Sequence, residues 1–256
     1  MIKLQQNSLK IIFFYKKITK KYYTIYITEK IKNKIPFTKT KGIDINMKKE
    51  QTIKHKNNYK WILFFICLIL FIILTKNIIK HQILQQDIII YNALKTYLLT
   101  PTLTPYIKAI TNLGGATCLI IITAVIFITI KNKKIGFLTL INLVTITILN
   151  QIIKHIIQRP RPTYHTLIKE TGYSYPSGHS MISMAFYGFL IYLIYKNLKN
   201  KALKITLITF LSLLILAIGL SRIYLGVHYI SDVIGGLLIS TSYLILYINI
   251  INKKIK

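Results

Sequence analysis

Two histidines stand where neighbouring residues could support nucleophilic attack or proton transfer. His228 precedes Asp232 by four residues, so one turn of helix would put both on the same face. A carboxylate beside an imidazole fixes the tautomer of the ring and supports a positive charge on it. The other histidine, His179, closes the segment 176–179, PSGH, directly before a strongly apolar run.

The residues next to His179 are suited to holding an anion. A helix that starts at this segment presents free backbone N–H groups and the positive end of its dipole. Ser177 adds a hydroxyl, and Gly178 lets an oxyanion approach the backbone closely. The segment therefore predicts an anion-binding turn at the start of a helix.

Arginine is rare in a chain that uses lysine freely, so its positions are informative. The sequence has three arginines, Arg159, Arg161 and Arg222, and a planar guanidinium binds two phosphate oxygens at once, as lysine cannot. Lys154 precedes Arg161 by seven residues, and a helix that stops near Pro160 would leave both at one end. These cations, with the histidines and the carboxylate, predict a phosphate site with a nucleophile and a proton donor.

The composition places this chemistry in a membrane protein. The chain has 256 residues and is 53% hydrophobic, with several near-continuous apolar runs that approach the length of a bilayer crossing. The predicted fold class is all-α, a polytopic bundle of six transmembrane helices. The six predicted spans are Trp61–Ile79, Leu113–Ile130, Ile135–Ile153, Met181–Tyr195, Ile205–Ser221 and Val233–Ile251. A shorter mixed stretch, 88–99, is predicted to be an interfacial helix.

The chain divides into two basic ends and one apolar domain. Residues 1–60 are predicted to be a disordered, basic cytoplasmic tail, within which Met1 and Met47 are both open as the translation start. Residues 61–251 form the predicted six-span domain, and residues 252–256 a basic cytoplasmic C-terminus. The net charge of +29 does not predict nucleic-acid binding, because no soluble basic face with interleaved aromatic residues is present.

Lysine runs predict the orientation in the bilayer. They fall before the first span, at 131–134, at 196–204 and at the end of the chain. The positive-inside rule places these segments and both termini in the cytoplasm. The connections 154–180 and 222–232, which carry the candidate site, are then predicted to lie outside.

Three motifs in order resemble the type 2 phosphatidic acid phosphatase superfamily, also called lipid phosphate phosphatases. The family's motifs are a Lys, six residues and Arg-Pro; a Pro-Ser-Gly-His; and a Ser-Arg, five residues, His, three residues and Asp. Here they stand at 154–162, 176–179 and 221–232 without a departure at any motif position. With the six-span layout, the resemblance extends over roughly 61–251.

The resemblance implies a mechanism that needs no metal or other cofactor. His228 would attack phosphorus and form a phosphohistidine, Asp232 would orient and charge-stabilise His228, and His179 would protonate the leaving oxygen. The phosphate oxygens would be held by Lys154, Arg161, Ser177, Gly178 and Arg222. Arg159 and Glu170 lie outside the motifs and are interpreted as an interfacial anchor and a solvated side chain.

Three alternatives remain open from the residues alone. His179, His228 and Asp232 could form a metal site of a membrane hydrolase, although the surrounding cations would repel a divalent ion. A transporter or channel is a second alternative, but its polar residues should lie at mid-depth in the spans. The third is a non-catalytic lipid-binding relative, which the intact motifs disfavour.

The resemblance also bears on substrate and location. The chain is short and has no extra domain, which is typical of a bacterial plasma-membrane enzyme. The family then implies undecaprenyl diphosphate, phosphatidylglycerophosphate or phosphatidic acid as substrate. The motif residues are expected to bind the phosphate group, so they do not indicate which lipid tail the substrate carries. An outward site favours undecaprenyl diphosphate by analogy, and the oligomeric state is not specified.

Overall fold

The computed structural model describes residues 40–163 and 166–254, and all regular secondary structure within them is helical. The predicted all-α fold class is therefore confirmed. The described helices are α2 (Thr40–His81), α3 (Gln85–Tyr97), α4 (Thr104–Asn112), α5 (Ala116–Thr129), α6 (Lys133–Ile157), α7 (Gly178–Asn197), α8 (Lys201–Tyr224) and α9 (Ile230–Lys254).

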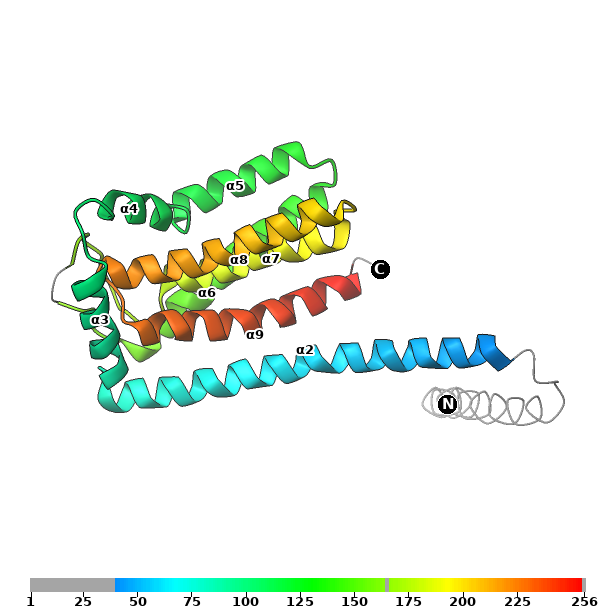
Figure 1. Ribbon diagram of the computed structural model, residues 1–256, viewed down its shortest axis with the longest axis horizontal. Coiled ribbons are helices and arrows are strands. Elements are labelled where there is room, and N and C mark those ends of the chain that lie inside the picture. The colour runs from blue at the N-terminus through cyan, green and yellow to red at the C-terminus, as the bar shows by residue number, and fades with distance from the viewer. Residues whose placement is uncertain (1–39, 164–165, 255–256) are drawn as a thin grey trace, which may run out of the picture. The chain divides into compact units, whose positions relative to one another are not determined.

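The long helices run side by side as a membrane bundle (Figure 1). Five segments of the described chain are long and apolar enough to cross a bilayer: Asn58–His81 of α2, and the helices α6, α7, α8 and α9. The pair α4 and α5, which meet at a bend of 47°, is a sixth candidate span when its two helices are taken together. With that pair counted as one span, the predicted six-span layout is observed.

The second span differs from its prediction because it is broken. The sequence predicts one helix from Leu113, whereas α5 begins at Ala116 and is only 14 residues long. The hydroxyl of Tyr187 donates a hydrogen bond of 2.7 Å to the Leu113 carbonyl, which a continuous helix would use internally. A Cβ on Gly114 would lie 2.6 Å from Ile218 and 2.8 Å from the Ser183 hydroxyl. The break therefore lets the backbone pass close to α7 and α8.

Helix α7 occupies the centre of the bundle, in contact with α6, α8 and α9. Its apolar side chains are distributed around the whole helix, as expected of a helix surrounded by others. Met181, Ala185, Phe186 and Phe189 are fully buried. Polar side chains add links between helices, including a 2.9 Å bond from the Asn142 amide on α6 to the Ala185 carbonyl. Such bonds and close packing hold helices together in a bilayer.

Two glycines bring the start of α9 against the turn that precedes α7. A Cβ on Gly236 would lie 3.0 Å from the Ser177 carbonyl oxygen and 3.2 Å from the Met181 backbone nitrogen. A Cβ on Gly235 would lie 2.5 Å from the ring of Tyr175, which is fully buried and stacks on Phe71. Tyr175 is thus a core residue.

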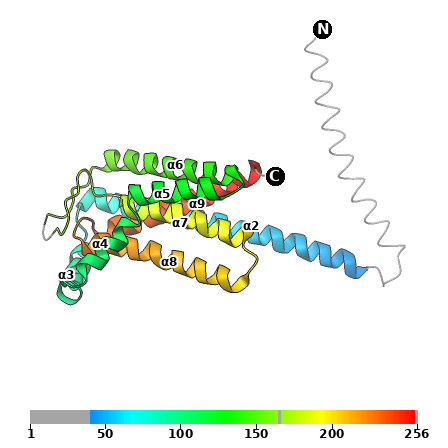
Figure 2. The same ribbon diagram turned by 90° about the horizontal axis from the view of Figure 1, so that it is seen from above.

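The first helix and α3 also depart from the predicted boundaries. Helix α2 begins at Thr40, inside the range 1–60 where a disordered tail is predicted, while residues 1–39 lie outside the described chain. A helix is observed near the predicted range 88–99, as α3, while its location at the membrane interface stays a prediction. Both views show α3 across one end of the bundle, next to the α6–α7 and α8–α9 connections (Figures 1 and 2).

We expect Gly235→Ala to destabilise the fold. The added methyl group would overlap the buried ring of Tyr175, and overpacking of this kind costs about 1–3 kcal/mol. The measurement is the thermal unfolding midpoint of the detergent-solubilised protein. Ile234→Ala is the control, because Ile234 is 43% exposed on the lipid-facing side of the same helix. An unchanged midpoint for Gly235→Ala would contradict this account of the packing.

Candidate active site

The predicted pair of His228 and Asp232 is formed in the structure. The Nδ1 atom of His228 lies 3.3 Å from Oδ2 of Asp232. The pair is not held within one helical turn as predicted, because His228 precedes α9 and only Asp232 lies in its first turn. The same carboxylate oxygen accepts a 2.9 Å bond from the Tyr229 backbone N–H and a 2.5 Å bond from the Ser174 hydroxyl.

The tautomer of His228 follows from its other ring nitrogen. Nη1 of Arg161 lies 3.1 Å from Nε2 of His228. A guanidinium carries donors only, so Nε2 must accept this hydrogen bond through its lone pair. The proton of the neutral ring is then on Nδ1, facing Asp232. This arrangement leaves Nε2 as the nucleophilic atom, directed towards a cationic side chain.

Burial keeps the His228 ring neutral. Desolvation lowers the pKa of His228 to about 4, the charge of Asp232 opposes this shift, and the charges of Arg161 and Lys154 add to it. Because an imidazolium has no free lone pair, a low pKa keeps Nε2 nucleophilic over the whole physiological range.

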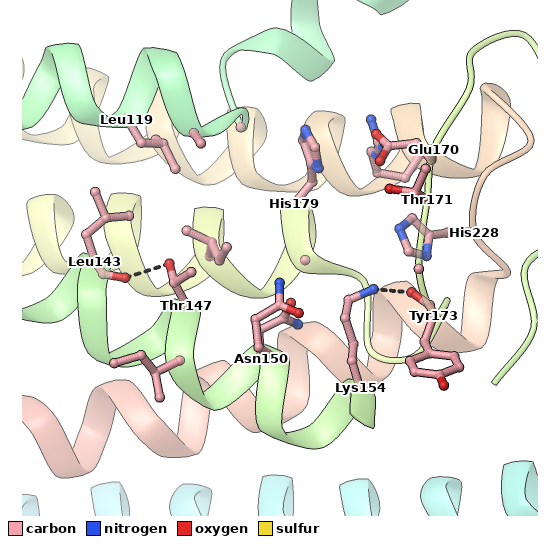
Figure 3. Close-up of a pocket in the computed structure, with 18 of the residues that line it drawn as sticks. Leu119, Leu143, Thr147, Asn150, Lys154, Glu170, Thr171, Tyr173, His179 and His228 are labelled. Carbon is pink, nitrogen blue, oxygen red and sulfur yellow. Dashed lines mark hydrogen bonds and ion pairs between the residues drawn. The ribbon is translucent and has the colours of Figure 1, made fainter. Parts of the chain in front are cut away.

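The predicted cations line the same cavity as this histidine, and Figure 3 shows Lys154 and His228 there, with Lys154 bonded to Tyr173. The Lys154 ammonium, at the last turn of α6, donates to the Tyr173 carbonyl. Arg161 is anchored by bonds of 3.0 Å to the carbonyls of Gly172 and Thr171. All three predicted phosphate-binding cations, Lys154, Arg161 and Arg222, line one cavity together with His228.

Arg222 is paired with a residue that was expected to be solvated. Its Nη2 donates a 2.5 Å bond to Glu170, and its Nη1 donates a 2.9 Å bond to Thr111. Burial acts to raise the pKa of Glu170, but the Arg222 hydrogen bond and the charges of Arg222 and Arg161 bring that pKa below its usual value. Glu170 is therefore an ionised part of the site. The buried Nε of Arg222 has no hydrogen-bond partner among the described residues.

The residues of the turn before α7 do not all have the roles that the motif predicts. Gly178 and His179 line the cavity, as the motif predicts. The Ser177 hydroxyl instead accepts from the Ser180 hydroxyl at 3.0 Å and caps α7, and Ser177 is fully buried outside the cavity lining. Its backbone N–H donates to the Asp232 carbonyl at 3.0 Å. In this geometry Ser177 shapes the turn and its hydroxyl does not face the cavity.

The cavity has a polar end and an apolar arm. Its volume is about 810 Å³, within the usual range for a small-molecule site. The polar end holds both histidines and the cations. The apolar arm runs between α5 and α6, lined by Leu119, Ile120, Leu140, Leu143, Val144 and Ile148. Val144 and Ile148 are about half exposed on the bundle surface, so the arm opens towards lipid.

Arg159 does not anchor at the interface, because it is only 1% exposed. Its Nη1 donates a 2.5 Å bond to Oδ1 of Asp232, and its Nη2 donates a 2.7 Å bond to Asp87. Asp87, on α3, is not among the site residues that the sequence predicts. One signal could have found it: a carboxylate beside an apolar stretch at a membrane surface usually has a partner.

The alternative of a metal site finds no support in the side-chain arrangement. Among the residues that the structure describes, no three His, Cys, Asp or Glu side chains lie together as metal ligands. His179, His228 and Asp232 therefore do not form the set that this alternative requires.

Comparison with known proteins identifies the family. The family model described as PAP2 superfamily matches residues 135–256. Phosphatidylglycerophosphatase B of Bacillus subtilis is 33% identical over 141 residues, which cover 53% of this chain and 69% of the relative. The chain belongs to the PAP2 superfamily. The predicted family and the predicted enzyme class, a lipid phosphate hydrolase, are thereby confirmed.

Further proteins are similar in sequence or fold. An undecaprenyl-diphosphatase of Sulfolobus acidocaldarius is 28% identical over 189 residues, 72% of this chain and 86% of the relative. The crystal structure of a transmembrane PAP2-type phosphatidylglycerolphosphate phosphatase from Bacillus subtilis is 30% identical, with a TM-score of 0.67, over 75% of this chain and 97% of that one. Aquifex aeolicus LpxE, at 21% identity and a TM-score of 0.53 over 65% of this chain and 99% of its own, shares the fold.

We expect His228 to titrate at about pH 4, well below an ordinary histidine. The measurement is an NMR pH titration of the histidine rings in detergent, with His228→Gln used to assign the resonance. The ordinary pKa of a histidine side chain is about 6.5. A His228 resonance that titrates near that value would contradict the neutral, buried ring.

Proposed function

We propose that this protein hydrolyses the phosphate headgroup of a membrane lipid through a phosphohistidine on His228. The three motif segments meet at one cavity, and their side chains have the partners that this reaction needs. Nε2 of His228 is unprotonated, Asp232 lies behind Nδ1, and His179 lines the same cavity. The proposal therefore assigns the nucleophile, its supporting carboxylate and the acid to these three residues.

In the first step the Nε2 lone pair of His228 forms a bond to phosphorus. The bond between phosphorus and the lipid oxygen breaks, and its electron pair stays on that oxygen. His179 is the proposed donor of a proton to this oxygen as it leaves. The ring of His228 becomes cationic during the attack, and Asp232 stabilises that charge through the Nδ1 proton.

In the second step water releases the phosphate. A water oxygen attacks phosphorus, His179 accepts the proton of the water, and the electron pair of the P–N bond returns to Nε2. Free phosphate and the starting form of His228 result. Each histidine thus returns to its original state after one turnover.

The phosphate oxygens would be held by Lys154, Arg161, Arg222 and the backbone N–H of Gly178. Donors of this kind stabilise charge as it develops in the transition state, and loss of one typically costs about 10²–10³ in rate. Ser177 contributes by capping α7 and holding the turn. Nη2 of Arg222 donates a hydrogen bond to Glu170. Phosphate must therefore compete with this carboxylate for Arg222.

The cavity shape is the observation that carries the lipid assignment. One continuous cavity of about 810 Å³ joins the histidines to an apolar arm between α5 and α6. A lipid could place its phosphate among the cations while its chain stays against apolar side chains. A water-soluble phosphate ester would leave the arm unfilled.

We further propose that the site faces away from the cytoplasm. The site lies at the end of the bundle crossed by α3, while the C-terminus and the α5–α6 and α7–α8 connections lie at the opposite end (Figure 1). Those connections are flanked by the lysine runs 131–134 and 196–204. The positive-inside rule favours a cytoplasmic location for that end.

Two substrate classes are supported by the relatives, a phosphomonoester lipid and a lipid diphosphate. Phosphatidylglycerophosphate is the first to test, because the Bacillus subtilis matches are named for activity on it. Undecaprenyl diphosphate, favoured by the outward site, stays a prediction that the name of the Sulfolobus relative also supports.

We expect the purified protein to release phosphate in EDTA from at least one of phosphatidylglycerophosphate, undecaprenyl diphosphate and phosphatidic acid. His228→Ala should lower the rate by at least about 10³-fold, because it removes the nucleophile. Phosphate release is measured at saturating lipid in mixed micelles. His81→Ala, at the exposed end of α2, is the control and should keep the wild-type rate.

Two outcomes would refute parts of this proposal. Release that disappears in EDTA and returns with a divalent cation would favour a metal-dependent hydrolase. Full turnover by folded His228→Ala would rule out the phosphohistidine.

We also expect Val144→Trp to impair lipid binding. The indole would fill part of the apolar arm, so KM for a long-chain lipid phosphate should rise about tenfold, equivalent to about 1.4 kcal/mol. The rate with a water-soluble phosphate ester should stay within about twofold, since the polar end is untouched. The control is Val125→Trp, because Val125 is exposed on α5 but does not line the cavity. Equal effects of both variants would refute the arm as a chain-binding site.

A further inference from the structure

Asp87 is a buried carboxylate that belongs to none of the three motifs. It lies in the first turn of α3, the helix across the site end of the bundle, and is 2% exposed. An ionised carboxylate is buried only at a large desolvation cost unless it is paired and hydrogen-bonded. Its partners therefore indicate why it is there.

Ser231, at the start of the helix that carries Asp232, supplies two of the hydrogen bonds to Asp87, and the Leu84 backbone N–H donates a 3.1 Å bond to Oδ2. Oδ1 accepts a 3.0 Å bond from the Ser231 backbone N–H, and Oδ2 accepts a 2.9 Å bond from the Ser231 hydroxyl. Oδ2 also accepts a 2.7 Å bond from Nη2 of Arg159. Asp87 thus connects α3 to the residue immediately before Asp232.

Arg159 links the two carboxylates. While Nη2 binds Asp87, Nη1 donates bonds to Oδ1 of Asp232 at 2.5 Å and to the Ser231 hydroxyl at 2.7 Å. Its Nε donates a 2.6 Å bond to the Gln82 carbonyl in the α2–α3 connection, and its guanidinium lies 4.2 Å from the ring centre of Tyr229. Each of the three guanidinium nitrogens of Arg159 therefore has a hydrogen-bond partner.

We propose that Asp87 and Arg159 are positioning residues, which orient the Asp232 carboxylate and through it the His228 ring. This inference rests on the proposed role of His228 as nucleophile. Arg159 occupies Oδ1 of Asp232, which leaves Oδ2 for His228, Ser174 and the Tyr229 N–H. Without Arg159 the buried Oδ1 would lose this donor, and the carboxylate could rotate away from His228.

Charge balance gives Asp87 a second part in this arrangement. A cation paired with Asp232 alone would neutralise the charge that must support the ring of His228 during attack. With Asp87 on its other side, Arg159 lies between two carboxylates, so the group of three keeps a net negative charge. That charge favours the cationic form of His228 that develops as the N–P bond forms.

The test begins with Asp87→Asn, which keeps the shape of the side chain but removes its charge. We expect kcat to fall about tenfold to a hundredfold, as misplacement of a catalytic group does, with KM within about twofold because the phosphate ligands are untouched. Gln86→Ala, an exposed neighbour on α3, is the matched control and should match the wild type.

A second readout needs no turnover. Diethyl pyrocarbonate modifies the free nitrogen of a neutral imidazole, and the rate at His228 can be followed by peptide mass spectrometry. We expect Asp87→Asn to slow this modification about threefold or more, because loss of the negative charge makes the ring nitrogen less basic and less nucleophilic. The rate at exposed His81 should not change.

A double variant tests the same coupling in case Asp87→Asn alone does not fold. Asp87→Asn combined with Arg159→Met removes the buried cation together with its partner, which is tolerated better than a lone charge. If Asp87 acts through Arg159, the double variant should be no slower than Arg159→Met alone. Additive losses in kcat and in the modification rate would overturn the proposed coupling.

The two readouts separate this inference from the proposed function. A wild-type protein without phosphatase activity would refute the function, while slowed modification of His228 in the variants would still support the positioning role. Normal kcat and normal modification in folded Asp87→Asn would overturn the positioning role and leave the phosphatase intact.

Discussion

Asp232 is fully buried, and the site is organised around the need to satisfy its charge. An ion removed from water costs several kcal/mol unless partners replace its hydration. The partners of Asp232 come from two connections that are far apart in sequence. Arg159 and Ser174 belong to the α6–α7 connection, and the Tyr229 N–H and His228 to the α8–α9 connection. Both connections must therefore meet at the same end of the bundle. The close contact of α9 with the turn before α7, which Gly236 permits, brings them there.

Local patterns in the sequence predict the elements better than the links between them. The apolar runs predict the spans, and the three motifs predict which residues meet at the cavity, because both signals are contained in short segments. The pairing of Arg159 with Asp87 joins residues 72 positions apart, and no local pattern reports it. The break before α5 depends on a hydroxyl from Tyr187 on another helix, so the apolar run around it reads as continuous. Ser177 matches a motif position, yet only the fold shows that its hydroxyl caps α7.

The cations of the site are already paired within the chain, which changes how phosphate binding should be understood. Arg222 holds Glu170, Arg161 holds backbone carbonyls and Nε2 of His228, and Lys154 holds the Tyr173 carbonyl. Under the proposed function, binding of phosphate would be an exchange of partners, and its net free energy would be smaller than the number of new contacts indicates. The exchange also favours a doubly charged phosphate over a singly charged anion such as a carboxylate, because the incoming group must outcompete Glu170.

The apolar arm between α5 and α6 has a kinetic consequence. A substrate that enters from the side never leaves its leaflet, so the encounter rate depends on its mole fraction in that leaflet and on two-dimensional diffusion. The two products then part in different directions. The dephosphorylated lipid returns sideways into the bilayer, while inorganic phosphate departs through the polar end into water. The reverse reaction would therefore require the lipid to return from the bilayer and phosphate to return from water to the same site.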